Sequence, residues 1–229
     1  GDFEQAFLDG KEALQGNIDC GSMLGIRRCL SNLGLIHFSH CQFDSALEHF
    51  KRVIEDMKST DDPAIATFEN IARVHLVRGA LEGCNLWLER IDAVPRQLNS
   101  VGRYVERHCL LLKAQLFARL GRGSESLACA EKLITFAQRS GDMFLGATAK
   151  LFAAELNLGL NRAEDSRALI DSVLPSLGSQ PPDIAGLYER AFACLLAATG
   201  ELEAGRLHRE RARRIFDGMR NGPALIELS

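Results

Sequence analysis

The sequence lacks the charge excess and the long apolar runs that mark many nucleic-acid-binding and membrane proteins. Its 27 Lys and Arg residues face 30 Asp and Glu residues, which gives a formal net charge of -3 and no basic footprint for DNA or RNA. The uncharged stretch at 191–200 has about half the length that a bilayer crossing needs. Residues 1–5 offer no basic region followed by an apolar one, as a secretory signal would. We therefore expect a cytoplasmic protein that neither enters a membrane nor binds nucleic acid directly.

Paired cysteines are also missing. None of the seven cysteines forms a Cys-x-x-Cys pair, and none has a His or Cys partner at zinc-finger spacing. An odd number of scattered cysteines indicates reduced thiols that serve as small hydrophobic residues on helical faces. The sequence therefore predicts no disulfide framework, no metal and no cofactor.

Catalytic motifs are absent as well. The sequence contains no His-Glu-x-x-His pair, no nucleophile elbow and no Gly-rich phosphate loop after a strand. The stretch from Gly121 to Ser124, Gly-Arg-Gly-Ser, resembles a phosphate cradle, but it lies between two helical patterns where a turn is expected. We therefore expect a protein that is not an enzyme.

What the sequence does contain is a repeat. A small residue recurs at 6, 46, 84, 126, 166 and 205, at spacings of 40, 38, 42, 40 and 39 residues. We interpret each as the crossing residue of a helical hairpin, because a small side chain lets two helices approach closely. These residues are Ala6, Ala46, Cys84, Ser126, Ser166 and Gly205. A supersecondary unit repeated in this way predicts a helical array that recognises partners.

The clearest unit resembles the tetratricopeptide repeat, because Leu33, Gly34, Ala46 and Phe50 lie at the signature offsets of that family. The resemblance extends along the whole chain with decreasing fidelity. It implies an all-α fold, an α-solenoid of antiparallel helix pairs that forms a right-handed superhelix. The mean period near 40 exceeds the usual length of about 34 residues. Similar lengthened repeats occur in bacterial signalling and transcription regulators, which makes transcriptional control the leading biological role.

Capping residues, prolines and glycines predict eleven helices in one continuous repeat domain, 1–229. The helices are expected at 3–15, 21–40, 44–58, 63–78, 81–93, 99–120, 124–139, 142–159, 163–176, 183–199 and 202–218. Residues 1–19 are interpreted as the second helix of a truncated repeat, which predicts a fragment of a larger protein. Full repeats follow at 20–60, 61–97, 98–141, 142–180 and 181–220, and Asn221-Gly222-Pro223 ends the last helix before a tail at 221–229.

Two of the six histidines, His37 and His75, share one repeat position. Equivalent positions of successive units lie roughly 10 Å or more apart, which is too far for shared ligation of one metal ion. A structural role is therefore favoured over a metal site, with the ring packed and one nitrogen hydrogen-bonded.

The family resemblance also implies a partner-binding groove lined by the first helix of each pair. Carried over by offset, the groove residues are Arg28, Ser31, Leu35, Phe38, Glu69, Arg73, His108, Leu111, Gln115 and Arg119. Leu76 takes such a place in the unit at 61–97, and Thr148, Leu151 and Glu155 do so in the unit at 142–180. This mixture suits a peptide with apolar anchors and a few charges. Leu35, Phe38 and Leu111 could equally pack against neighbouring helices, and both interpretations stay open.

The region 206–214 holds five arginines, which could contact an acidic partner or form a solvated helical face. Its continuation to Met219 looks like the last helix of the repeat region in large ATP-dependent transcription activators. The expected function is a non-enzymatic interaction or regulatory module that binds a protein or peptide. The alternative is a self-assembly scaffold, with a homodimer formed through an apolar edge that includes Phe3, Phe7 and Leu14, or through the tail at 221–229.

Overall fold

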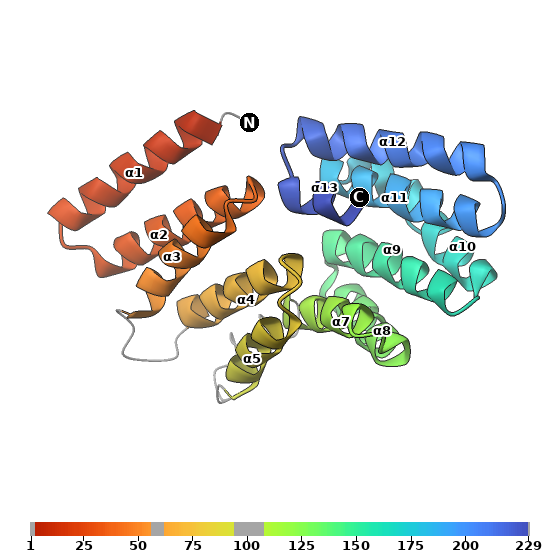
Figure 1. Ribbon diagram of the computed structural model, residues 1–229, viewed down its shortest axis with the longest axis horizontal. Coiled ribbons are helices and arrows are strands. Elements are labelled where there is room, and N and C mark those ends of the chain that lie inside the picture. Colours follow the sequence, from red (N-terminus) through yellow and green to blue (C-terminus); the bar gives the residue numbers. More distant parts are fainter. Residues whose placement is uncertain (1–2, 56–61, 94–107, 229) are drawn as a thin grey trace. The chain divides into compact units, whose positions relative to one another are not determined.

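The computed structural model describes residues 3–55, 62–93 and 108–228 of the chain. Every regular element in these ranges is helical, which confirms the predicted all-α class and the packing of adjacent helix pairs (Figure 1). The chain divides into two compact units. Unit 1 comprises residues 1–101 and 220–226, and unit 2 comprises residues 102–219 and 227–229. The expectation of a single continuous domain stays a prediction.

Unit 1 contains two antiparallel helix pairs preceded by a single helix, α1 (Phe3–Asp19). The pairs are α2 (Met23–Ser39) with α3 (Phe43–Glu55), and α4 (Asp62–Val77) with α5 (Leu81–Asp92). In the first pair, the Phe50 ring is fully buried against Gly34, where an added Cβ would overlap it. This close approach is why a glycine occupies that position of the signature.

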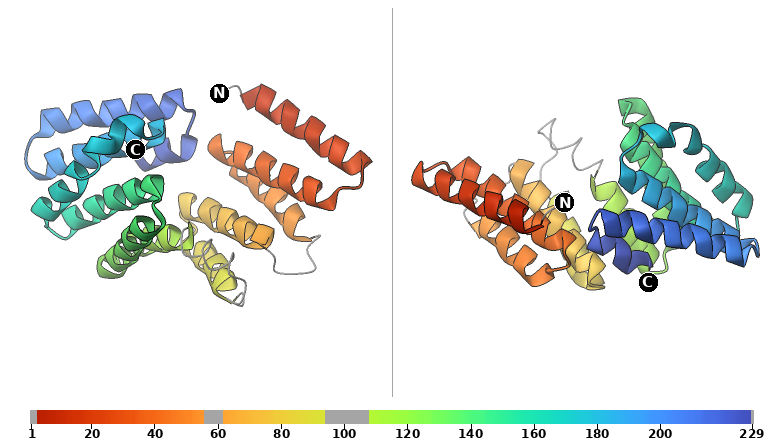
Figure 2. Two further views of the ribbon diagram at one scale, coloured as in Figure 1. Left: turned by 180° about the vertical axis from the view of Figure 1, so that it is seen from behind. Right: turned by 90° about the horizontal axis from the view of Figure 1, so that it is seen from above.

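Unit 2 contains three pairs, whose first helices are α7 (Leu110–Arg119), α9 (Met143–Gly159) and α11 (Pro182–Ala198). Their partners are α8 (Gly123–Ser140), α10 (Ala163–Asp171) and α12 (Leu202–Gly218), and the paired helices lie side by side in each view (Figure 2). A 3-10 helix, η2 (Leu174–Ser179), follows α10. The last described helix, α13 (Gly222–Leu228), has its first residues in unit 1 and Glu227 and Leu228 in unit 2. Arrays of this kind bury their apolar faces between neighbouring pairs.

The five hairpin turns share one backbone geometry. Each has a residue with positive φ five positions before the crossing residue, and the next residue donates its N–H to a carbonyl five positions earlier, as in Arg122 to Phe117 at 2.8 Å. This left-handed cap closes the end of the first helix and reverses the chain. The positive-φ residues are Cys41, Gly79, Gly121, Asn161 and Gly200. They recur at the predicted spacing, so the repeat of the sequence is a repeat of the structure.

Five of the predicted crossing residues are buried between the helices of their pairs, whereas the sixth, Ala6, is exposed on α1. The Ser126 hydroxyl donates to the Ala114 carbonyl oxygen at 2.6 Å, from the second helix to the first. A Cβ added at Gly205 would lie 3.1 Å from the Ala193 carbonyl oxygen. Ala114 and Ala193 both stand twelve positions before their crossing residue, as Gly34 does. Small residues therefore meet small residues at these crossings.

Several predicted boundaries are wrong. The helix expected at 163–176 ends at Asp171, because Pro175 has no N–H to donate to the carbonyl four residues earlier, and the chain continues as η2. The tail expected at 221–229 contains α13. Its start is fixed by Asn221, whose Oδ1 accepts the Ala224 N–H at 3.2 Å. The first helix runs to Asp19 rather than 15. The predicted stretches 56–58 and 99–107 lie outside the described residues.

Candidate functional site

The first-helix residues predicted to bind a partner fall in both units, and each unit is described by itself. In unit 1, Arg28 is exposed and Leu35 is 38% exposed, whereas Ser31 is half-buried. Phe38 packs against the cluster around Phe50, with its ring centroid 6.0 Å from that of Phe43. Leu35 thus presents an apolar side chain to solvent, while Phe38 contributes to the core.

Glu69 and Arg73 form an ion pair on α4. The Glu69 side chain is almost completely buried, and the Arg73 side chain is 38% exposed. The hydrogen bond between these two charged groups ties one guanidinium nitrogen of Arg73 to the Glu69 carboxylate. The rest of the partly exposed Arg73 side chain remains accessible to solvent.

In unit 2, the predicted residues of α7 are less distinctive. Leu111 packs against the cluster around Leu133, and Gln115 is half-buried. Arg119 is exposed at the end of α7, and His108 lies just before its start. The structure does not gather these four residues into a charged site.

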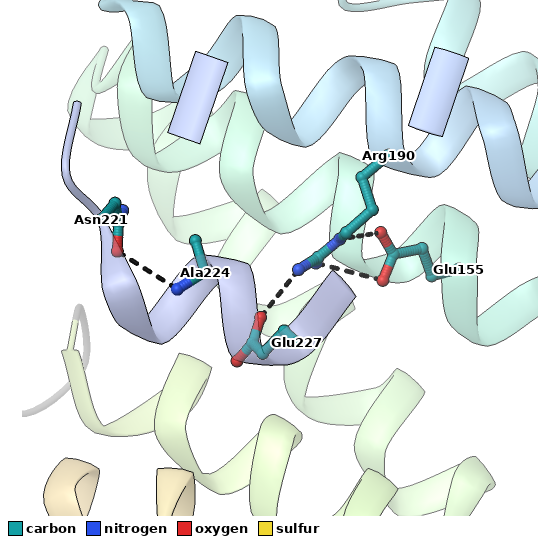
Figure 3. Close-up of polar contacts among 5 residues, drawn as sticks. All are labelled: Glu155, Arg190, Asn221, Ala224 and Glu227. Atoms are coloured by element: carbon teal, nitrogen blue, oxygen red, sulfur yellow. Dashed lines mark hydrogen bonds and ion pairs between the residues drawn. The ribbon is translucent and has the colours of Figure 1, made fainter. Parts of the chain in front are cut away.

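A half-buried charge cluster instead links α9, α11 and the end of α13. The Arg190 guanidinium donates to both carboxylate oxygens of Glu155, at 2.8 and 3.2 Å, and to Glu227 Oε2 at 2.7 Å (Figure 3). Only 13% of the Arg190 side chain is exposed, against 23% for Glu155 and 28% for Glu227. Arg190 is therefore held between two carboxylates from different helices. We name these three residues the Arg190 cluster.

Electrostatics in the Arg190 cluster follow from this arrangement. Burial alone would lower the pKa of Arg190, but the adjacent Glu155 and Glu227 carboxylates raise it above its usual value. Burial raises the pKa of Glu155, and the Arg190 charge opposes that change.

The end of α13 has a second attachment in unit 2. Arg209 of α12 donates from Nε to the Leu228 carbonyl oxygen at 3.1 Å, and from a terminal nitrogen to the same atom. Leu228 is buried, with 7% of its surface exposed. An arginine and an apolar contact thus hold the last turn of α13 beside the Arg190 cluster.

Arg190 and Glu155 occupy the same two repeat positions as Glu69 and Arg73, with the acidic and basic residues exchanged. Glu69 and Arg190 stand fifteen positions before their crossing residues, and Arg73 and Glu155 stand eleven before theirs. The sequence prediction included Glu155 but missed Arg190 and Glu227. The shared offset could have identified Arg190, but Glu227 lies in a tail to which the repeat pattern assigns no position.

The histidines and cysteines lie outside the Arg190 cluster. His37 is buried and donates from Nδ1 to Gln42 Oε1 at 2.5 Å, as expected for a packed ring. The described residues contain no group of three His, Cys, Asp or Glu side chains placed to hold a metal ion. Cys84 and Cys109 are buried, but Cys20 and Cys194 are exposed, so the thiols are not uniformly core residues.

The arginines at 206–214 follow no single pattern. Arg206 and Arg214 form exposed ion pairs with Glu203 and Glu210 of the same helix. Arg209 instead holds the end of α13, as described above.

No helix in the described part of the chain combines the length and apolar character required to span a bilayer.

Comparison with known proteins identifies a similar fold without a family. No protein-family model matches the sequence. No curated protein matches it either. The crystal structure of BtubC (BKLC) from P. vanneervenii superimposes with a TM-score of 0.65, over 97% of this chain and 93% of that chain, at 12% sequence identity. At this identity the likeness shows the fold alone.

Proposed function

We propose that this chain is a non-enzymatic interaction module, with tetratricopeptide-like repeats, that binds a protein or peptide segment along its first helices. The observation that carries this proposal is the contact between Arg190 and Glu227. There, a first-helix arginine, backed by a carboxylate of the neighbouring first helix, holds an acidic side chain from a short helix. Charge-assisted hydrogen bonds of this type are among the stronger polar contacts available to an arginine.

The pair on α4 supports the same mode of binding in unit 1. Glu69 pairs with Arg73 within α4, as Glu155 of α9 pairs with Arg190 of α11, and the Arg73 side chain is partly exposed. Leu35, at the equivalent offset on α2, adds an exposed apolar side chain. The preferred partner is therefore an amphipathic segment that offers one carboxylate to Arg73 and one apolar side chain to Leu35.

In this proposal the module belongs to a bacterial signalling or transcription regulator and acts in the cytoplasm. Partner binding on the repeats is transmitted to an effector domain elsewhere in the parent protein. The ending at 211–219 supports this role through its resemblance to the last repeat helix of such regulators.

The test is a pull-down from an extract of the source cells, with bound proteins quantified by mass spectrometry. The face variant combines Glu69→Gln, Arg73→Met and Leu35→Ser, so that no buried carboxylate is left unpaired. The control variant carries matched changes on second helices, Lys51→Met and Leu86→Ser, where both side chains are exposed. A partner retained by the control and lost from the face variant supports the proposal. Equal retention by both variants refutes it.

Self-assembly is the second candidate, because α1 has no buried residue and exposes apolar side chains. Leu8 is 58% exposed and Ile18 is 46% exposed. The residues named in the sequence prediction, Phe3, Phe7 and Leu14, are half-buried. A dimer that forms with increasing concentration in light scattering, and is abolished by Leu8→Glu with Ile18→Glu, supports this function. A monomeric mass at high concentration excludes it.

A further inference from the structure

Unit 2 contains a cavity of about 270 Å³ at one end of its middle helix pairs. It lies among the last turns of α8, the first turns of α9, and the segment that follows α10. This cavity is separate from the Arg190 cluster, and nothing in the proposed function depends on it.

We attribute the cavity to the early end of α10. Helix α8 has 18 residues, whereas α10 has 9, because Pro175 prevents its continuation. The backbone turns into η2, and the cavity is lined by Val173, just before η2, and by Ser176 within it.

The cavity has an apolar interior and a charged rim. Its interior includes Ile134 of α8, Ala147 of α9 and Val173, of which the last two are buried. Lys150 of α9 is half-buried at the wall, and among the described residues no carboxylate forms an ion pair with it. The carboxylate of Asp142, which also lines the cavity, accepts the Leu145 N–H at 3.0 Å as the cap of α9.

We propose that this cavity binds a small organic acid with a short apolar body, its carboxylate paired with Lys150. A half-buried ammonium beside an apolar cavity favours a ligand that supplies one negative charge. The volume is just below the roughly 300–1,000 Å³ typical of sites for drug-sized ligands, so the acid is small. Gly146 lines the wall, and an added Cβ there would be in ordinary contact, at 3.5 Å, with the Ala137 Cβ.

The test follows the Met143 methyl resonance by NMR in the full chain, labelled at the methionine methyl groups, because Met143 lines the cavity. Sodium hexanoate is the probe, and hexylamine and 1-hexanol at equal concentration are its comparisons. Hexanoate is expected to shift the resonance saturably. Lys150→Met is expected to weaken hexanoate binding about tenfold, while Lys132→Met, an exposed lysine of α8, leaves it unchanged.

A second pair of variants tests the cavity itself. Gly146→Leu places a side chain in the space and is expected to abolish the shift, whereas Gly146→Ala retains it. Folding of each variant is checked by circular dichroism, and the Lys150 result stands even if Gly146→Leu fails to fold. The proposal is overturned if hexanoate gives no saturable shift. It is also overturned if hexylamine binds equally well or if Lys150→Met leaves the hexanoate affinity unchanged.

Discussion

Removal of Arg190 tests how strongly the Arg190 cluster stabilises unit 2. In Arg190→Met, the Glu155 carboxylate loses two hydrogen bonds and its only partner within the Arg190 cluster, with 23% of its side chain exposed. Breaking a buried ion pair by deleting one partner costs about 3–5 kcal/mol in the free energy of unfolding. Because Glu155 keeps some contact with water, we expect the lower end of that range, about 3 kcal/mol.

Two companion variants give the comparison. Glu227→Gln keeps its shape but loses its charge, and Arg190 keeps Glu155, so we expect a smaller loss of about 1–2 kcal/mol. Glu155→Gln combined with Arg190→Met removes both charges of the Glu155–Arg190 pair and leaves only Glu227 charged, so the double variant should recover part of the stability lost in Arg190→Met. The order of stability among these three variants therefore separates the cost of an unpaired carboxylate from the cost of a lost hydrogen bond.

The assay is urea unfolding followed by far-UV circular dichroism, with hydrogen exchange of peptides from α11 as a local readout. Arg206→Met is the matched control, because the Arg206–Glu203 pair is 78% and 87% exposed at its side chains and should contribute less than about 1 kcal/mol. The reasoning is refuted if Arg190→Met destabilises no more than Arg206→Met, or if exchange in α11 is unchanged.

Three further predictions concern pH, turns and thiols. Burial lowers the pKa of His49 in the folded state, so the unfolded state binds the proton at a higher pH as the pH is lowered. The free energy of unfolding, followed by thermal melts, should therefore decrease below about pH 6.5, and the decrease should be smaller in His49→Gln. Gly121→Ala places a Cβ at φ 73 with open space around it and should cost about 1 kcal/mol in urea unfolding, whereas Asn161→Gly should not destabilise. Burial raises the pKa of Cys84 to about 12, so in native protein Ellman's reagent should modify the exposed Cys20 and spare Cys84 until urea unfolds the chain.

Local pattern was enough to predict the helical hairpins, because each hairpin depends on residues close in sequence. The crossing residues, the turn glycines at 79, 121 and 200 and the close approach at Gly34 all have short-range causes. Even Cys41 and Asn161 adopt the left-handed conformation of the turn, although neither is glycine. The repeat context therefore outweighs the local backbone preference at these two positions.

Long-range contacts were not predictable in the same way. Arg190 meets Glu155 across 35 residues and Glu227 across 37, and neither separation follows from the pattern of one helix. The signal for α13 was present in Asn221 and Pro223, which suit a helix start as well as a stop. The cavity depends on where α10 ends, and Pro175 marks that position only when the neighbouring helix is known to continue.

Site-specific photo-crosslinking tests the binding face most directly. A benzophenone amino acid is placed at Leu35 on the first helix α2, or at Leu86 on the second helix α5, where the leucine is 50% exposed. The account predicts that the probe at Leu35 crosslinks a discrete partner segment in source-cell extract and that this segment contains an acidic residue near the crosslink. The probe at Leu86 should give no such product. Equal crosslinking from both positions, or crosslinking from Leu86 alone, would contradict a binding face on the first helices.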